Sequence, residues 1–141
     1  MYEWPRPMFT VDVAVFCVNG GKRQILLIKR SKDPFAGKWA LPGGFVNMDE
    51  DLPDAAAREL CEETGIRGLA LKQMHTFGMP GRDPRGRTIS TVFMGVIQGQ
   101  QPQVRGGDDA AEARWFDIDD LPGLAFDHDE VTAMAIMRLS Q

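Results

Sequence analysis

Three glutamates with a spacing suited to metal chemistry occur together at Glu59, Glu62 and Glu63. Residues 52–64 have the pattern of a helix, in which each residue turns by about 100°, so the three carboxylates fall within an arc of roughly 100°. Two carboxylates about 6 Å apart repel by roughly 3 kcal/mol at an effective dielectric of about 20. This repulsion favours a positive charge bound among them.

A solvated acidic helix face is the plain alternative for such a row of glutamates. Here the adjoining arc of the helix, which includes Ala56 and Leu60, is apolar and suited to packing on a core. Arg58 is the only basic residue within the helix. Carboxylate oxygens suit Mg²⁺ or Mn²⁺ better than zinc, and the chain contains only two histidines. The helix therefore favours a site for one of these two metal ions.

Local signals define the elements that must position this helix. Asp51 is suited to capping its start, Pro53 is tolerated in its first turn, and Gly65 ends it. Apolar runs at 9–18 and 24–28, separated by Asn-Gly-Gly, predict a β-hairpin. The remaining expectations are loops at 30–44, 78–87 and 99–111, strands at 69–77, 88–96 and 113–116, and a last helix capped by Asp127 and Glu130.

Length and composition exclude several classes of protein. A chain of 141 residues suits one domain, and we expect residues 1–141 to form it. The net charge of −4 argues against nucleic-acid or membrane partners. Two isolated cysteines form no disulfide framework, and the N-terminus lacks an apolar leader. These features favour a cytoplasmic protein.

The helix and its flanks also carry a known motif. Its members are Gly44, Glu50, Arg58-Glu59-Leu60, Glu62-Glu63 and Gly65-Ile66. Their identities and spacing resemble the 23-residue Nudix box of Nudix hydrolases. The resemblance implies an α/β fold, a Nudix-type α/β/α sandwich with a mixed sheet. It also implies metal-dependent hydrolysis of a diphosphate bond, with the three glutamates and the Gly43 carbonyl as metal ligands. Arg58 would orient the carboxylates, and Glu50 would fix the loop to the helix.

Three arginines, Arg82, Arg85 and Arg87, lie close together in the loop 78–87. Their guanidinium groups suit phosphate binding or stacking on a purine, although a solvated basic loop is the alternative. This loop, with residues 38–45 and 125–128, resembles the ADP-ribose pyrophosphatase branch of the family. The resemblance implies cleavage of ADP-ribose to AMP and ribose 5-phosphate. The alternatives are a nucleoside-triphosphate or dinucleoside polyphosphate hydrolase, or a non-catalytic module that senses ADP-ribose.

Several further residues are candidates for the site, and most of them also have a structural explanation. Trp39 and Phe45 are candidates for stacking on a base or for the core. His128 is a candidate for contacting substrate, with a surface position as the alternative. Glu112 is a candidate general base, whereas Asp108 and Asp109 are more typical of solvated loop acids. The resemblance also allows a homodimer.

Overall fold

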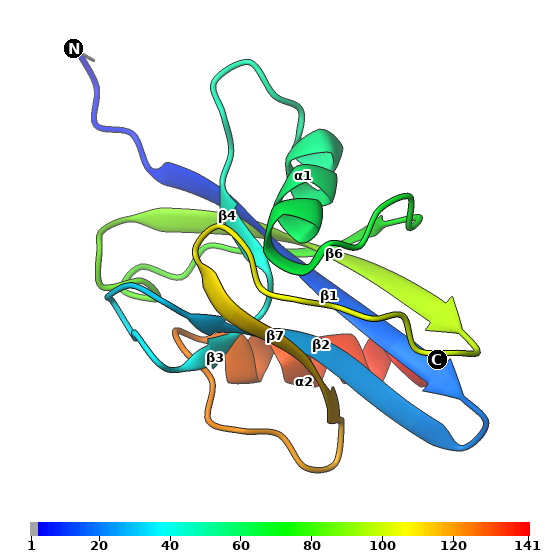
Figure 1. The fold of residues 1–141 in the computed structure, drawn as a ribbon. Coiled ribbons are helices and arrows are strands. Elements are labelled where there is room, and N and C mark those ends of the chain that lie inside the picture. Colours follow the sequence, from blue (N-terminus) through cyan, green and yellow to red (C-terminus); the bar gives the residue numbers. More distant parts are fainter. Residues whose placement is uncertain (1–2) are drawn as a thin grey trace.

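A mixed β-sheet forms the centre of the computed structural model, which describes residues 3–141 (Figure 1). The strands are β1 (Met8–Asn19), β2 (Lys22–Arg30), β3 (Trp39–Ala40), β4 (Gly43–Phe45), β5 (Lys72–Phe77), β6 (Thr88–Gln98) and β7 (Ala110–Asp117). The main strand order is β3-β2-β1-β6-β5, with β4 paired to β1 and β7 paired to β2. β1 and β6 run parallel, and the other pairs are antiparallel.

Helices α1 (Leu52–Thr64) and α2 (His128–Leu139) cover opposite faces of this sheet (Figure 1). Successive side chains of a strand point to opposite faces, so the central strand β1 supplies both cores. Val11, Val13 and Val15 pack with Ala56 and Leu60 of α1, whereas Ala14 and Phe16 pack with Val131 and Ala135 of α2. The expected α/β/α sandwich with a mixed sheet is confirmed.

The ends of α1 form as the local signals predict. The Asp51 carboxylate accepts a hydrogen bond from the Leu52 amide at 2.8 Å. Gly65 ends the helix with φ of 84°, a left-handed conformation, and its amide donates to the Cys61 carbonyl. The buried face includes Glu59 and Glu63 themselves, because the helix turns these acids further toward the sheet than the apolar pattern predicts.

Some segments differ from the expectations, and β5 begins at Lys72 rather than at 69. Residues 30–44 were expected to be a loop, but Trp39–Ala40 pairs with β2 and Gly43–Phe45 pairs with β1. β7 begins at Ala110 rather than 113, because its first residues extend the pairing with β2. The pairing of β4 with β1 holds this segment close to α1.

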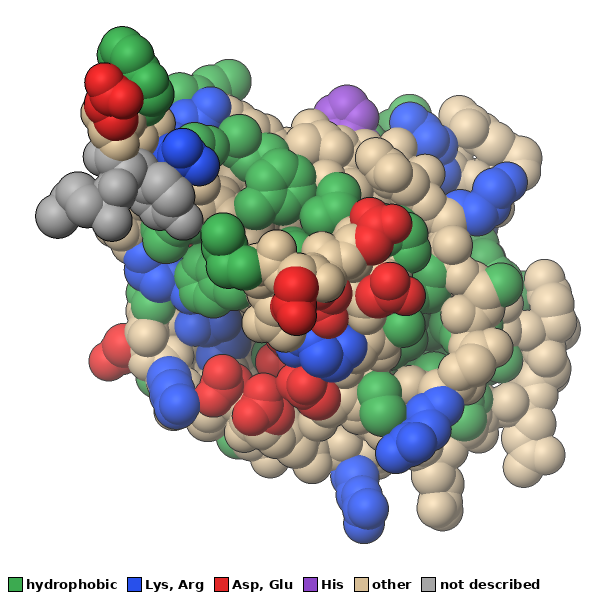
Figure 2. Space-filling model, turned by 90° about the horizontal axis from the view of Figure 1, so that it is seen from above, with side chains coloured by type: hydrophobic (Ala, Val, Ile, Leu, Met, Phe, Trp, Pro, Cys, Tyr) green, Lys and Arg blue, Asp and Glu red, His purple; other side chains and the backbone are tan. Residues whose placement is uncertain are grey.

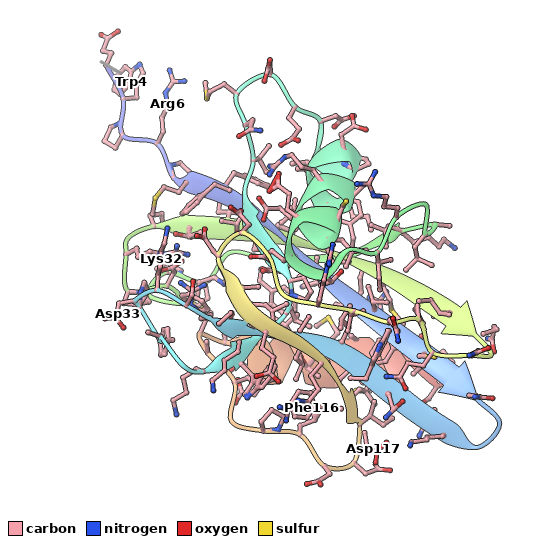
Figure 3. All side chains as sticks on the ribbon, in the orientation of Figure 1. Trp4, Arg6, Lys32, Asp33, Phe116 and Asp117 are labelled. Atoms are coloured by element: carbon pink, nitrogen blue, oxygen red, sulfur yellow. The ribbon has the colours of Figure 1, made fainter. Side chains whose placement is uncertain are left out.

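The N-terminal segment before β1 extends away from the sheet and carries Trp4 and Arg6, as Figure 3 shows. Lys32 and Asp33 lie on the β2–β3 connection in the same view. Within residues 3–141, no helix combines the length and the apolar character needed to cross a membrane.

Candidate active site

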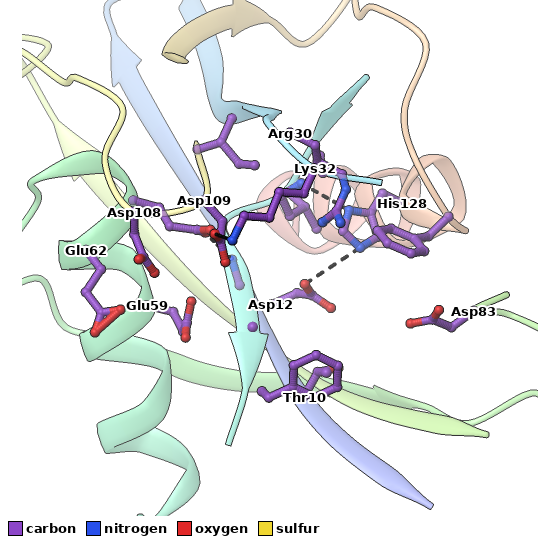
Figure 4. Close-up of a pocket in the computed structure, with 18 of the residues that line it drawn as sticks. Thr10, Asp12, Arg30, Lys32, Glu59, Glu62, Asp83, Asp108, Asp109 and His128 are labelled. Carbon is purple, nitrogen blue, oxygen red and sulfur yellow. Dashed lines mark hydrogen bonds and ion pairs between the residues drawn. The ribbon is translucent and has the colours of Figure 1, made fainter. Parts of the chain in front are cut away.

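A pocket of about 320 Å³ opens between α1, the β3–β4 turn, the β5–β6 loop and the segment before β7. Carboxylates line one half of it, as Figure 4 shows for Glu59, Glu62, Asp108 and Asp109. Arg30, Arg82 and Arg85 line the other half, together with the Phe45 and Phe126 rings. On the face seen from above α1, acidic and basic side chains gather beside apolar ones (Figure 2). The pocket therefore has an acidic half, which also holds Arg58 and Lys32, and a basic half, which also holds Asp83.

Arg58 organises the acidic half. Its Nη1 donates to Glu59 Oε1 at 2.7 Å and to Glu62 Oε1 at 3.3 Å. Its Nε and Nη2 donate to the two carboxylate oxygens of Glu50 at 2.7 and 2.8 Å, and Nη2 also donates to the Phe45 carbonyl. Arg58 thus links Glu50, in the loop before α1, to Glu59 and Glu62 on the helix.

Glu63 lies deeper than its neighbours and has a different partner. It is 4% exposed, and its Oε1 accepts a hydrogen bond from the Gly43 amide at 2.8 Å. Burial, together with the charges of Glu59 and Asp12, raises the pKa of Glu63 to about 8. Burial also raises the pKa of Glu59. In contrast, the hydrogen bonds from Arg58 lower the pKa of Glu50 to about 2.

No Lys, Arg or His within residues 3–141 forms an ion pair with Glu63. Its ionised form is therefore poorly compensated, and a bound cation would stabilise it. The described residues contain no group of three or more His, Cys, Asp or Glu side chains already arranged to hold a metal ion. Arg58 lies between Glu59 and Glu62 instead, so metal binding requires these side chains to adjust.

The loop before β7 contributes two further acids. Asp108 has φ of 55°, an uncommon conformation for a residue other than glycine, and lines the pocket. The Asp109 carboxylate pairs with Lys32 at 3.0 Å. Gly107 lets this loop approach α1 closely, because a Cβ added there would lie 2.6 Å from the Glu62 carbonyl oxygen. The loop acids therefore sit beside the helix glutamates.

Glu112 does not join this group. It lies within β7 opposite Lys29, pairs with Arg114, and does not line the pocket. The structure thus places Asp108 and Asp109 beside the glutamates, whereas the sequence analysis favoured Glu112 among these three acids. The reason is that β7 begins early enough to take Glu112 into the sheet.

The loop arginines have different environments. Arg82 is buried and donates to the Asp127 carboxylate through Nε at 2.9 Å and Nη2 at 2.7 Å. Asp127 is the N-cap residue of α2, as expected, but it makes no side-chain capping bond, and its carboxylate accepts from Arg82 instead. Arg85 pairs with Asp83, and its guanidinium lies 4.8 Å from the Phe45 ring centroid. Arg87 is exposed and does not line the pocket.

Sequence analysis missed Arg30, at the end of β2. Its Nε donates to the Pro34 carbonyl at 2.8 Å, and its guanidinium lies 4.9 Å from the Phe126 ring centroid. Burial and then the charge of Arg85 lower the pKa of Arg30. No carboxylate of residues 3–141 pairs with Arg30. A basic pair, Lys29-Arg30, at the end of an apolar run was the available signal.

Of the aromatic and histidine candidates, Phe45 and His128 line the pocket and Trp39 does not. Phe45 lines the pocket and is 41% exposed. Trp39 packs edge-to-face against Phe116 and does not line the pocket, so the structure does not place it with the other candidates. His128 lines the pocket but is only 4% exposed, so the alternative of a surface position is wrong. Its Nδ1 accepts a hydrogen bond from the Leu41 amide at 3.0 Å.

Comparisons with known proteins agree with this geometry. A family model described as NUDIX domain matches residues 8–135. The chain is 46% identical to an ADP-ribose pyrophosphatase of Methanocaldococcus jannaschii over 120 residues, which are 84% of this chain and 69% of that protein. It is 38% identical to the ADPR responsive transcriptional repressor NtrR of Acinetobacter baylyi, over 98% of this chain and 56% of the repressor.

A solved structure shows the same fold. The NUDIX domain of Shewanella oneidensis NrtR, in a cocrystal structure with ADP ribose, matches with a TM-score of 0.88 and 30% identity. The match covers 96% of this chain and 90% of that one. On the family match and the similarity to the pyrophosphatase, together with the motif residues assembled on α1 and β4, the chain belongs to the Nudix family and is a Nudix hydrolase.

Proposed function

We propose that the protein hydrolyses the diphosphate bond of ADP-ribose and releases AMP and ribose 5-phosphate. The observation that carries the proposal is that one pocket gathers the α1 glutamates on one side and arginine and aromatic side chains on the other. A diphosphate that links a nucleoside to a second sugar suits such a pocket, because its negative charge and its base require different binding partners. The similarity to the Methanocaldococcus jannaschii pyrophosphatase supports this choice of substrate.

The acidic half fits Mg²⁺ or Mn²⁺, because it offers hard oxygen ligands and a buried carboxylate without a cationic partner. We assign Glu59, Glu62, Glu63 and the Gly43 carbonyl as the residues that would hold the metal. A divalent ion bound there would neutralise the diphosphate and promote ionisation of the attacking water. Arg58 would keep Glu59 and Glu62 oriented while they bind.

The basic half would bind the substrate. Only the Nε of Arg30 is bonded to a residue of the described chain, which leaves its terminal nitrogens to donate to a phosphate oxygen. Arg85, whose guanidinium lies over the rings of Phe45 and Phe126, would add positive charge. Phe45 is 41% exposed, and the part of its ring that Arg85 leaves open would stack on a base. Arg82 would act indirectly by fixing the loop, since its guanidinium is committed to Asp127.

A sensor of ADP-ribose is the second candidate, favoured by the similarity to the repressor NtrR and to NrtR. Both functions need ADP-ribose binding, but only the hydrolase needs the carboxylate half. The retained glutamates, gathered around one pocket, favour catalysis. Triphosphates and dinucleoside polyphosphates remain the competing substrates within the enzyme class.

Product analysis tests the proposal. Purified protein is incubated with Mg²⁺ or Mn²⁺ and, separately, with ADP-ribose, NADH, 8-oxo-dGTP and diadenosine polyphosphates. Selective release of AMP from ADP-ribose supports the proposal, and turnover of a triphosphate instead refutes the substrate. Binding of ADP-ribose without any cleavage supports the sensor.

A matched pair of variants then tests the site. Glu63→Gln should abolish turnover while leaving the thermal transition nearly intact, because the change removes a poorly compensated buried carboxylate. Glu112→Gln makes the same chemical change outside the pocket and should retain wild-type activity. Equal losses in both variants would contradict the assignment.

A further inference from the structure

Hydrogen bonds fix the turn between β3 and β4 at three consecutive residues. The Leu41 amide donates to Nδ1 of His128 at 3.0 Å, and the Pro42 carbonyl accepts from the Val13 amide at 2.8 Å. The Gly43 amide donates to Oε1 of Glu63 at 2.8 Å. Two of these bonds come from β1 and α1. The third comes from α2, on the opposite face of the sheet, so one side chain links the far layer to the acidic half of the pocket.

The hydrogen bond from Leu41 determines which nitrogen of His128 carries a proton. A backbone amide can only donate, so Nδ1 must be the unprotonated nitrogen and the hydrogen lies on Nε2. Nε2 is 3.6 Å from Oδ1 of Asp12, and Oδ2 of Asp12 accepts a hydrogen bond from the Ser90 hydroxyl at 2.5 Å. His128 is 4% exposed and Asp12 is 7% exposed. The groups around both ring nitrogens therefore favour the neutral tautomer that carries its hydrogen on Nε2 (Figure 4).

The position of His128 along the chain is also fixed. Asp127, the preceding residue, is held by two hydrogen bonds from Arg82. Ala125 is fully buried, and its amide donates to the Trp39 carbonyl at 2.8 Å. The ring of His128 thus cannot shift along α2 to follow a displaced turn. The turn must instead adapt to the histidine.

We propose that His128 is a positioning residue for metal binding: through the Leu41 amide it fixes the turn whose Gly43 amide orients the Glu63 carboxylate. In this role it acts through the Leu41 amide and not as a metal ligand. Partners one step removed from the ligands commonly alter metal affinity by about 10- to 100-fold when they are replaced. The inference rests on the proposed metal site, but not on the choice of ADP-ribose as substrate.

The first test uses the wild-type protein without metal or substrate. The nitrogen chemical shifts of the His128 ring, measured by NMR, should show an unprotonated Nδ1 and a protonated Nε2. The Leu41 amide should exchange slowly with deuterium although it lies outside the β3 ladder. A proton on Nδ1, or rapid exchange at Leu41, would overturn the inference. Neither measurement requires a variant that folds.

The second test measures Mn²⁺ binding directly by calorimetry in three variants. His128→Leu removes the acceptor and should weaken Mn²⁺ binding by about tenfold. His128→Asn keeps an acceptor oxygen near the Nδ1 position and should restore binding to within about threefold of wild type. Thr132→Val is the matched control one turn along α2. Its buried hydroxyl has no hydrogen-bond partner among the described residues, so binding should not change.

The outcomes separate this inference from the proposed function. Wild-type Mn²⁺ affinity in His128→Leu, or equal weakening in His128→Asn and His128→Leu, would overturn the positioning role even if ADP-ribose is cleaved. Conversely, a protein that ignores ADP-ribose but loses Mn²⁺ affinity only in His128→Leu would refute the substrate and support the positioning role. If the leucine variant does not fold, the asparagine variant and the wild-type NMR measurements decide the question.

Discussion

Replacing Gly44 by alanine would place a methyl group directly against the carboxylate of Glu59. A Cβ at position 44 would lie 2.5 Å from Glu59 Oε2 and 2.6 Å from its Cδ. Ordinary contact begins at 3.4 Å, so the carboxylate would have to move by about 0.9 Å. Glu59 is 7% exposed and is held by Arg58 at 2.7 Å, so it cannot move freely.

A displacement of this size should act mainly on catalysis. A misplacement of about 1 Å at a reacting centre can lower the rate by about 100-fold, which corresponds to roughly 2.7 kcal/mol in the activation free energy. The stability loss should be smaller, about 1 kcal/mol. Overpacking costs roughly 1–3 kcal/mol, and alanine recovers part of this by restricting the unfolded chain. The melting temperature should fall by only about 4 °C.

Steady-state kinetics with ADP-ribose and a thermal melt of Gly44→Ala test this reasoning. Gly21→Ala is the control, because a Cβ there has no neighbour within 4 Å and the residue does not have a positive φ. It should match the wild type in the kinetic assay and melt at the same or a slightly higher temperature, because alanine restricts the unfolded chain. A Gly44→Ala variant with kcat within threefold of wild type would show that catalysis does not depend on the position of Glu59.

Three further predictions concern the rest of the pocket. Arg82→Ala should lower the free energy of unfolding by about 3 kcal/mol in urea titrations, because it leaves the Asp127 charge partly buried without its partner; an unchanged midpoint would show that the pair adds nothing. Arg30→Ala should raise KM for ADP-ribose about tenfold and leave Mn²⁺ affinity unchanged, and an unaltered KM would remove Arg30 from the site. Burial lowers the pKa of His128 from 6.5 in the folded protein, so below about pH 6.5 the unfolded chain binds a proton that the folded chain does not. Stability relative to His128→Asn should therefore fall as the pH decreases below about 6.5, and a constant difference would contradict the lowered pKa.

Helix α1, which carries the proposed metal ligands, was the most predictable part of the molecule. Its signals are local: Asp51 caps it, Gly65 ends it, and the glutamate spacing follows from the helical turn. The strands of the hairpin were predictable for the same reason, because an apolar run and a glycine turn lie next to one another in the chain.

The charge pairing in the pocket was not predictable, because it depends on residues far apart in sequence. Arg82 and Asp127 are separated by 45 positions, and only the fold shows that one neutralises the other. The same holds for Arg30 and Phe126, which meet because the segment before α2 packs beside the end of β2. Glu112 and Asp108 are four positions apart, yet the starting point of β7 determines which of them reaches the pocket.

The contact between Gly107 and the Glu62 carbonyl constrains how this protein can evolve. The spacing between the loop and α1 is set by two backbones that meet without a side chain between them. Any substitution at 107 therefore pushes the whole loop outward, and no compensating change in side-chain size can restore the distance. The side chain at position 108 is then what can change the group that the loop presents to the glutamates. Among related sequences with this geometry, position 107 should remain glycine while position 108 records differences in chemistry.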